Sequence, residues 1–254
     1  GTALTNEDDF TLTIPSGESI SNSHTNHQSR DLNGEVNTTV TNNNTFDTTA
    51  PTFTADRTAL NTIVLTFNEA VTGTVTSGSF TVAGSGTVTN TAPSGSTTVT
   101  LTTSGLTSTS STPEVNYVAA SGDVVDASSS GTNEVANGGA VSAADSVPPT
   151  FTADRTGDNT IVLAFSENVD VTTTNGAGYA VSGGTVTANT DPAGSSTTMT
   201  LTTSGITDAS ATPTVTYTQA AGTTLDAASN EVSNGGNAVA TDSVAPTLSA
   251  VSIV

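Results

Sequence analysis

The sequence contains no cysteine, no lysine and no tryptophan, and its three basic side chains are all arginines. Without cysteine, the chain can form neither a disulfide nor a thiolate zinc site. Its 3 basic and 23 acidic side chains give a formal net charge of −20. A nucleic-acid-binding protein needs cationic side chains to displace phosphate counterions, and an anionic membrane surface would repel this chain. No apolar run approaches the ~20 residues of a membrane-spanning helix. We therefore expect no nucleic-acid partner and no direct membrane insertion.

What the sequence does contain is a long internal repeat. The segment PTFTADRT begins at Pro51 and recurs intact at Pro149, and the shorter echo PTLSAVSIV begins at Pro246. Between these starts, NTIVLTFNEAV is answered by NTIVLAFSENV, and STTVTLTTSGL by STTMTLTTSGI. The small differences in length are typical of loops. The repeat predicts four segments: residues 1–47, a first domain at 48–145, a second domain at 146–244, and at 245–254 the first strand of a further domain or a strand donated to another subunit.

Apolar residues within each repeat recur with a period of two, as in Ile63, Leu65 and Phe67. β-Branched residues dominate, and clusters of Gly, Pro, Asn or Ser interrupt the pattern roughly every 8–12 residues. No segment shows the apolar spacing of an amphipathic helix. About seven short strands in each repeat, with one apolar face each, are typical of a two-sheet sandwich. The sequence therefore predicts an all-β fold of tandem immunoglobulin-like β-sandwich domains.

Residues 1–47 do not share the repeat. They hold one strand-like run at residues 10–14 and then a polar tract, which fits a partial domain, an extended arm or a linker. We interpret them as an extended N-terminal segment. The tract carries N-glycosylation sequons at Asn37 and Asn43, which matter only in an exported protein and also arise by chance in Asn/Thr-rich sequence.

Acidic residues recur at matching loop positions in the two repeats. The second strand runs back towards the start of its domain, so the loop after it lies at the N-terminal end of the sandwich. In an immunoglobulin-like sandwich the loop between the last two strands lies at that end too, and the preceding linker adds one more acid. Asn133 and Asn230 accompany the acids of the later loop. The predicted metal-binding groups are Asp47, Glu69, Asp126 and Glu134 at the first junction, and Asp145, Glu167, Asp226 and Glu231 at the second.

Four carboxylates packed together with no compensating lysine repel one another and raise each other's pKa values. A hard divalent cation relieves this repulsion, and Ca²⁺ accepts an irregular mixture of carboxylate, amide and carbonyl oxygens. The pattern predicts one structural Ca²⁺ at each domain junction, which would stiffen the tandem array. The alternative is that these loops are solvated turns whose acids serve solubility.

The sequence has few residues suited to catalysis. His24 and His27 are its only histidines, both lie before the repeats, and no GxSxG motif supports a Ser-His-Asp triad. A zinc site on these two histidines would lack a further histidine or cysteine. The NGG turns at Asn137 and Asn234 precede no phosphate-binding lysine. A glycosidase-like carboxylate pair is conceivable, but the recurring acids lie at domain ends, which suits a structural role. We therefore expect no enzymatic activity.

The pairs Asp56-Arg57 and Asp154-Arg155 recur at the end of the first strand of each repeat. One interpretation makes each arginine an anchor for a neighbouring subunit or for a glycan carboxylate. The other is a local ion pair or turn contact, worth under ~1 kcal/mol if exposed.

Together these features resemble a known type of protein. The phrase NTIVLTFNEAV, the later tyrosine-containing strand, the loop VVDASS…NEV and the linker DSVAPT are similar to the tandem immunoglobulin-like domains of large prokaryotic surface proteins, most closely the surface-layer proteins of marine ammonia-oxidising archaea. The resemblance covers about residues 47–254. It implies an extracellular, glycosylated, calcium-dependent subunit that assembles with itself into a lattice and is anchored elsewhere in a longer chain. It also implies pores whose acidic walls attract cations such as ammonium, which dense negative charge supports in general terms.

Two other structural functions fit the same features. In one, the chain is a subunit of an extracellular pilus or thread, with residues 246–254 or 10–14 inserted as a donor strand in a neighbour. In the other, it is the stalk of a large adhesin.

Overall fold

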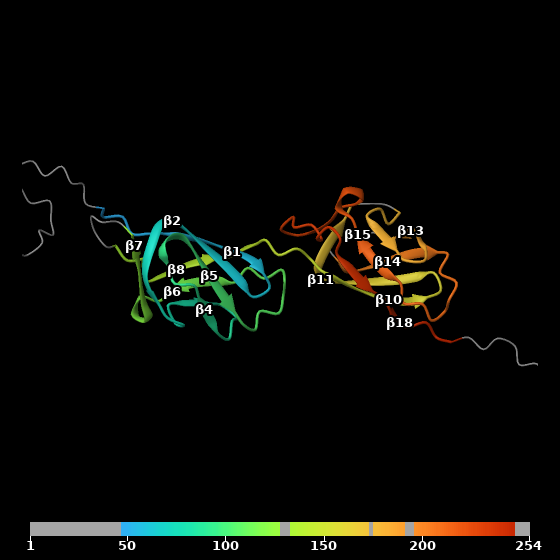
Figure 1. Ribbon diagram of the computed structural model, residues 1–254, viewed down its shortest axis with the longest axis horizontal. Coiled ribbons are helices and arrows are strands. Elements are labelled where there is room, and N and C mark those ends of the chain that lie inside the picture. Colours follow the sequence, from blue (N-terminus) through green and yellow to red (C-terminus); the bar gives the residue numbers. More distant parts are fainter. Residues whose placement is uncertain (1–46, 128–132, 173–174, 191–195, 247–254) are drawn as a thin grey trace, which may run out of the picture. The chain divides into compact units, whose positions relative to one another are not determined.

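The computed structural model describes residues 47–127, 133–172, 175–190 and 196–246 (Figure 1). By its internal contacts the chain divides into residues 1–47 and residues 48–254, and the strands described below belong to the second unit. The predicted extended N-terminal segment, its two sequons and its two histidines lie outside the described residues, as does most of the predicted strand at 245–254.

Residues 48–145 form two sheets that enclose one apolar core. The larger sheet has the strand order β4-β5-β2-β1-β9, and β7 pairs with the far part of β2. All its pairs are antiparallel except β1 with β9. Its strands are β1 (Phe53–Ala59), β2 (Thr62–Val75), β4 (Val88–Asn90), β5 (Ser94–Thr103), β7 (Gly122–Asp126) and β9 (Ala144–Asp145). The smaller sheet consists of β3 (Phe80–Val82), β6 (Glu114–Tyr117) and β8 (Gly138–Ser142).

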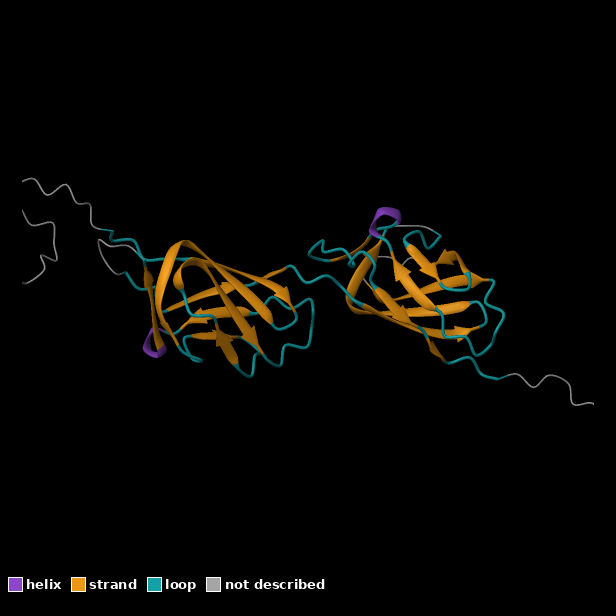
Figure 2. Cartoon of the chain, in the orientation of Figure 1, coloured by secondary structure: helices purple, strands orange, loops and turns teal. Residues whose placement is uncertain are grey.

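The second repeat has the same topology, with its own core (Figure 2). The larger sheet consists of β10 (Phe151–Gly157), β11 (Thr160–Val171), β13 (Thr185–Asn189), β14 (Ser196–Ser204), β16 (Thr224–Asp226) and β18 (Thr241–Asp242), and the smaller of β12 (Tyr179–Val181), β15 (Thr214–Tyr217) and β17 (Asn237–Val239). Within the described residues, two 3₁₀ turns, at Ala119–Ser121 and Gln219–Ala221, are the only helical elements, and neither could cross a membrane. The predicted all-β fold of β-sandwich domains is confirmed. The predicted segment boundaries stay a prediction.

The period-two pattern places one face of each central strand in the core. Ile63, Leu65 and Phe67 on β2 are buried, and across the ladder Ile63 faces Leu101 while Leu65 faces Val99 on β5. Because successive side chains of a strand point to opposite faces, the intervening residues of β2 lie at or near the surface.

The long strands β2 and β11 each change partner partway along. One edge of β2 pairs with β1 as far as Phe67 and with β7 from Val71 onward. On its other edge the register with β5 is interrupted between Thr66 and Val71. β11 repeats this pattern with β10, β16 and β14. Glu69 and Glu167 lie in these interruptions, so the kink, and not a regular ladder, determines where their side chains point.

The two arginines of the repeat are buried inside their own domains. The guanidinium of Arg57 is fully buried and donates to the backbone carbonyls of Leu60, Ser108, Thr109 and Ser111 at 2.7–3.3 Å. Arg155 donates in the same way to the carbonyls of residues 158, 208, 209 and 211, and its side chain lies 3.9 Å from the carboxylate of Asp158. The interpretation as surface anchors is therefore wrong, and the turn contact is correct. Each arginine clamps a loop at the end of its sandwich.

The three tyrosines of the chain lie in the cores. The hydroxyl of Tyr117 accepts a hydrogen bond from the backbone N–H of Val124 and lies 2.8 Å from a carboxylate oxygen of Glu134. Tyr217 is placed identically against Thr224 and Glu231. Burial is the main cause that raises the pKa of Tyr117 and Tyr179 to about 12, and burial with the Glu231 carboxylate raises the pKa of Tyr217 further still.

We expect the folded protein to form no phenolate at about pH 10, the ordinary tyrosine pKa. A raised pKa means that the folded state holds the phenolic proton more tightly, so this stability is complete below about pH 10 and is lost as the pH rises through the folded values. Ultraviolet absorbance during alkaline titration measures the phenolate directly. The urea-unfolded chain should titrate near pH 10, and a folded chain that titrates there too would contradict the buried placement.

Replacing Arg57 by Met removes the donors of at least four hydrogen bonds, one buried and three partly buried, and leaves the loop carbonyls without them. We expect the free energy of unfolding to fall by roughly 3 kcal/mol, measured by urea denaturation. Thr58→Ala, at the exposed neighbouring position, should change it by less than about 0.5 kcal/mol. Equal stability of the two variants would refute the clamp.

Candidate metal centre at the domain junctions

Three of the four acids in each predicted group come together. Asp145, Glu167 and Asp226 each offer a carboxylate oxygen, and these three oxygens lie within 4.8 Å of one another. The repeat-equivalent group, of Asp47, Glu69 and Asp126, meets the same criterion. Each group takes one acid from the linker, one from the kink of the long strand and one from the end of β7 or β16.

Local structure fixes each member of the second group. Asp145 ends β9, and its carboxylate accepts a hydrogen bond of 3.1 Å from the backbone N–H of Val147, which forms an Asx turn at the linker. Glu167 lies in the kink of β11, and Asp226 ends β16 opposite Val169. Because Asp145 belongs to a strand of the first sandwich and the other two acids to the second, the group spans the junction.

Glu167 is a buried carboxylate with an unsatisfied oxygen. Its side chain is 5% exposed, as is that of Asp226, and its Oε1 atom is buried without a hydrogen-bond partner. Burial raises the pKa of Glu167, and the charges of Asp226 and Asp145 raise it further, against a hydrogen bond from Thr109. Burial likewise raises the pKa of Asp145. Buried polar atoms are normally hydrogen-bonded, so this oxygen, which no donor reaches and which lies beside two further carboxylates, is suited to accept a ligand.

An asparagine holds the innermost aspartate of each group. The backbone N–H and side-chain amide of Asn230 donate to the two carboxylate oxygens of Asp226 at 2.7 and 2.9 Å, and the amide also lies 3.0 Å from the carbonyl oxygen of Asp145. Asn133 donates to Asp126 through the same two groups, at 3.1 and 2.7 Å. The sequence predicted that these asparagines lie near the acids, but not that they donate hydrogen bonds to the aspartates.

Glu134 and Glu231 do not belong to the two groups. Each forms an isolated bridge with a strand and approaches the hydroxyl of Tyr117 or Tyr217. Glu231 directly follows Asn230, and successive side chains of an extended chain point to opposite sides. The expectation that four carboxylates meet is therefore corrected to three.

The sequence pattern did not place Thr109 or Arg57 near the second group. The hydroxyl of Thr109, in the loop that Arg57 clamps, lies 3.3 Å from the carbonyl oxygen of Ser166. The positive charge of Arg57 also lowers the pKa of both Asp145 and Glu167, against the effect of burial. The recurrence of Arg57 was visible in the sequence, but the reach of its loop into the next domain was not.

The donor set suits a hard divalent cation. Three carboxylates, two of them buried, provide a strong negative field and only oxygen ligands, which is the chemistry of a Ca²⁺ site. Ca²⁺ binds about six to eight oxygen ligands, so carbonyl oxygens and water would complete its coordination. A thiolate or imidazole metal would find no suitable ligand among these residues.

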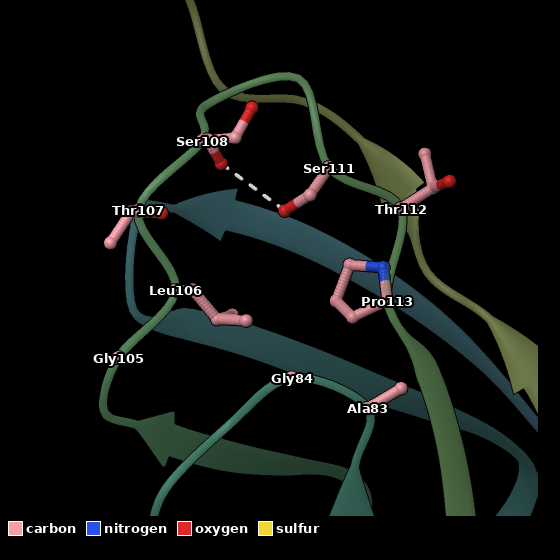
Figure 3. Close-up of a pocket in the computed structure, with 9 residues that line it drawn as sticks. All are labelled: Ala83, Gly84, Gly105, Leu106, Thr107, Ser108, Ser111, Thr112 and Pro113. Carbon is pink, nitrogen blue, oxygen red and sulfur yellow. Dashed lines mark hydrogen bonds between the residues drawn. The ribbon is translucent and has the colours of Figure 1, made fainter.

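A separate shallow cleft of about 290 Å³ lies beside the loop of the first sandwich that Arg57 clamps (Figure 3). Figure 3 shows Leu106 and Pro113 lining it, beside Ser108 and Ser111, which are linked by a hydrogen bond of 3.1 Å. None of its nine lining residues is ionisable, so the cleft offers neither an acid–base pair nor a carboxylate ligand.

Comparison with known proteins assigns no family to the chain. No family model matches it, and no curated protein matches it. Among solved structures, it is similar to InvD of Yersinia pseudotuberculosis, with 15% sequence identity and a TM-score of 0.23. The similarity covers 80% of this chain and 61% of that chain, so it spans less than two thirds of InvD. A TM-score this low supports no conclusion about fold or function.

Replacing Glu167 by Gln keeps the side chain's size and removes one of three negative charges. In the presence of a chelator, we expect the variant to unfold at a higher temperature than the parent. Its free energy of unfolding should rise by on the order of 1 kcal/mol, because the repulsion between the carboxylates and the burial of a charge are relieved. In excess Ca²⁺ the parent gains stability by mass action and the variant gains less. Thermal unfolding followed by circular dichroism measures both effects. The exposed Glu114→Gln should behave as the parent, and a full parental gain in Glu167→Gln would contradict the site.

Proposed function

We propose that this chain is a structural part of an extracellular surface layer that assembles with copies of itself, and that Ca²⁺ at its domain junctions stiffens it. The observation that carries the proposal is the group of Asp145, Glu167 and Asp226, in which a buried carboxylate oxygen lacks a donor at the junction of two sandwiches. A cation bound by all three acids would tie the first sandwich to the second.

The surface chemistry supports the same proposal. With −20 net charge and three arginines, two of them buried in the described domains, almost no positive side chain is left at the surface to balance the acids. Such a surface concentrates cations and repels polyanions. We propose cations and further copies of the chain as its partners, no enzymatic activity, and glycans at Asn37 and Asn43. The resemblance of the repeats to archaeal surface-layer domains points the same way.

Electron microscopy of the assembled protein tests this function. We expect ordered two-dimensional lattices in millimolar Ca²⁺, and dispersal of the lattices when a chelator removes the cation, because the junctions then lose their shared ligand. Helical symmetry of the assembled protein would contradict a surface layer and would indicate a pilus or thread. Isolated stiff particles with no order at any Ca²⁺ concentration would instead favour an adhesin stalk.

A further inference from the structure

One side chain contacts both halves of the second junction. Asn230 lies in the second sandwich and holds both carboxylate oxygens of Asp226, through its backbone N–H and its amide. The same amide lies 3.0 Å from the carbonyl oxygen of Asp145, which ends a strand of the first sandwich. Asn230 therefore bridges the two domains at the residues that supply two of the three carboxylates.

We propose that Asn230 is a positioning residue that couples cation binding at the Asp145–Glu167–Asp226 group to the docking of the two domains. The inference rests on the proposed calcium function. By holding both oxygens of Asp226, Asn230 fixes the orientation of one ligand, and by donating to the backbone of Asp145 it fixes the place of another. Residues that orient metal ligands in this way change metal affinity by about 10–100-fold when they are mutated.

The acids around Asn230 form more than a charged patch. Glu167 is 5% exposed, and its Oε1 atom lacks a hydrogen-bond partner although its carboxylate belongs to the group. A buried acceptor oxygen without a hydrogen-bond donor, beside two further carboxylates, favours the binding of a cation. The side-chain amide of Asn230 cannot take the place of that cation, because it already donates to Asp226 and Asp145.

The coupling has a thermodynamic consequence. If Asn230 holds ligands from both domains in one arrangement, the docked arrangement binds the cation more tightly, and the bound cation favours docking by the same factor. Removing the side chain of Asn230 should therefore weaken Ca²⁺ binding and also loosen the domains in the presence of Ca²⁺. A purely structural asparagine would lower thermal stability without affecting either property of the folded protein.

Calorimetric titration of the full chain with Ca²⁺ tests the first effect. Glu69→Gln is introduced throughout to weaken the first group, so that the second dominates the titration. In this background we expect Asn230→Ala to lower the Ca²⁺ affinity about 10-fold or more. Asn234→Ala is the matched control, because Asn234 lies in the same domain and accepts one backbone hydrogen bond away from the site. Its Ca²⁺ affinity should equal that of the background.

Distance measurement between two spin labels tests the second effect. Because the chain has no cysteine, labels attach only at introduced sites, and Thr102→Cys and Thr202→Cys mark equivalent exposed positions of the two domains. Ca²⁺ should narrow the distance distribution in the background chain and in Asn234→Ala, and should leave it broad in Asn230→Ala. If Asn230→Ala does not fold, Asn230→Ser carries both tests, because a hydroxyl has one hydrogen to donate and cannot replace both side-chain bonds of the amide.

The outcomes separate the two proposals. Unchanged Ca²⁺ affinity and normal narrowing in the Asn230 variant overturn the coupling role and leave the calcium function standing. Absence of Ca²⁺ binding in the background chain overturns the calcium function, and the coupling role with it.

Discussion

The long strand of each sandwich carries two neighbours in succession, first β1 or β10 and then β7 or β16. Between these two neighbours, the register of the long strand with β5 or β14 on its other edge is interrupted for a few residues, and such a bulge-like interruption bends a strand. At this interruption, the glutamate of the long strand lies at the end of the sandwich, together with the linker and the loop after β7 or β16. Everything proposed for function depends on this break, because it is where Glu167 meets acids from two other segments.

Electrostatics then determine what that meeting can do. With no lysine, the only cations of the described chain are Arg57 and Arg155, and both are engaged mainly by backbone carbonyls inside their own sandwiches. Arg57 lies close enough to lower the pKa of Asp145 and Glu167, but burial and mutual repulsion act more strongly in the opposite direction. Three acids thus remain undercompensated at the junction. A divalent cation bound there, as proposed, would neutralise this charge and supply the contact that Glu167 Oε1 lacks.

The same arrangement joins the cation to domain architecture. Thr109, held by the Arg57 clamp, reaches the backbone of the second sandwich, and Asn230 reaches back to the first. Both contacts lie beside the carboxylate group, so local order at the junction and cation binding draw on the same residues. In a repeated chain, a cation bound at each such joint would restrain neighbouring domains relative to one another.

Much of this was determined by the sequence alone. The repeat and the period-two pattern of Ile63, Leu65 and Phe67 specify two all-β sandwiches, because side-chain alternation decides which face is buried. Matching loop positions also identified Asp145, Glu167 and Asp226, since strand direction decides which end of a sandwich a loop occupies. The tertiary structure decided the rest. It turned Glu134 and Glu231 towards tyrosine hydroxyls, buried both arginines against carbonyls, and made Asn230 a bridge. Glu134 and Glu231 lie at isolated bridges, where no periodicity remains for a sequence to reveal. The arginines keep the inward alternation of their strands, but the carbonyls that they contact come mainly from a loop about 50 residues later in the chain.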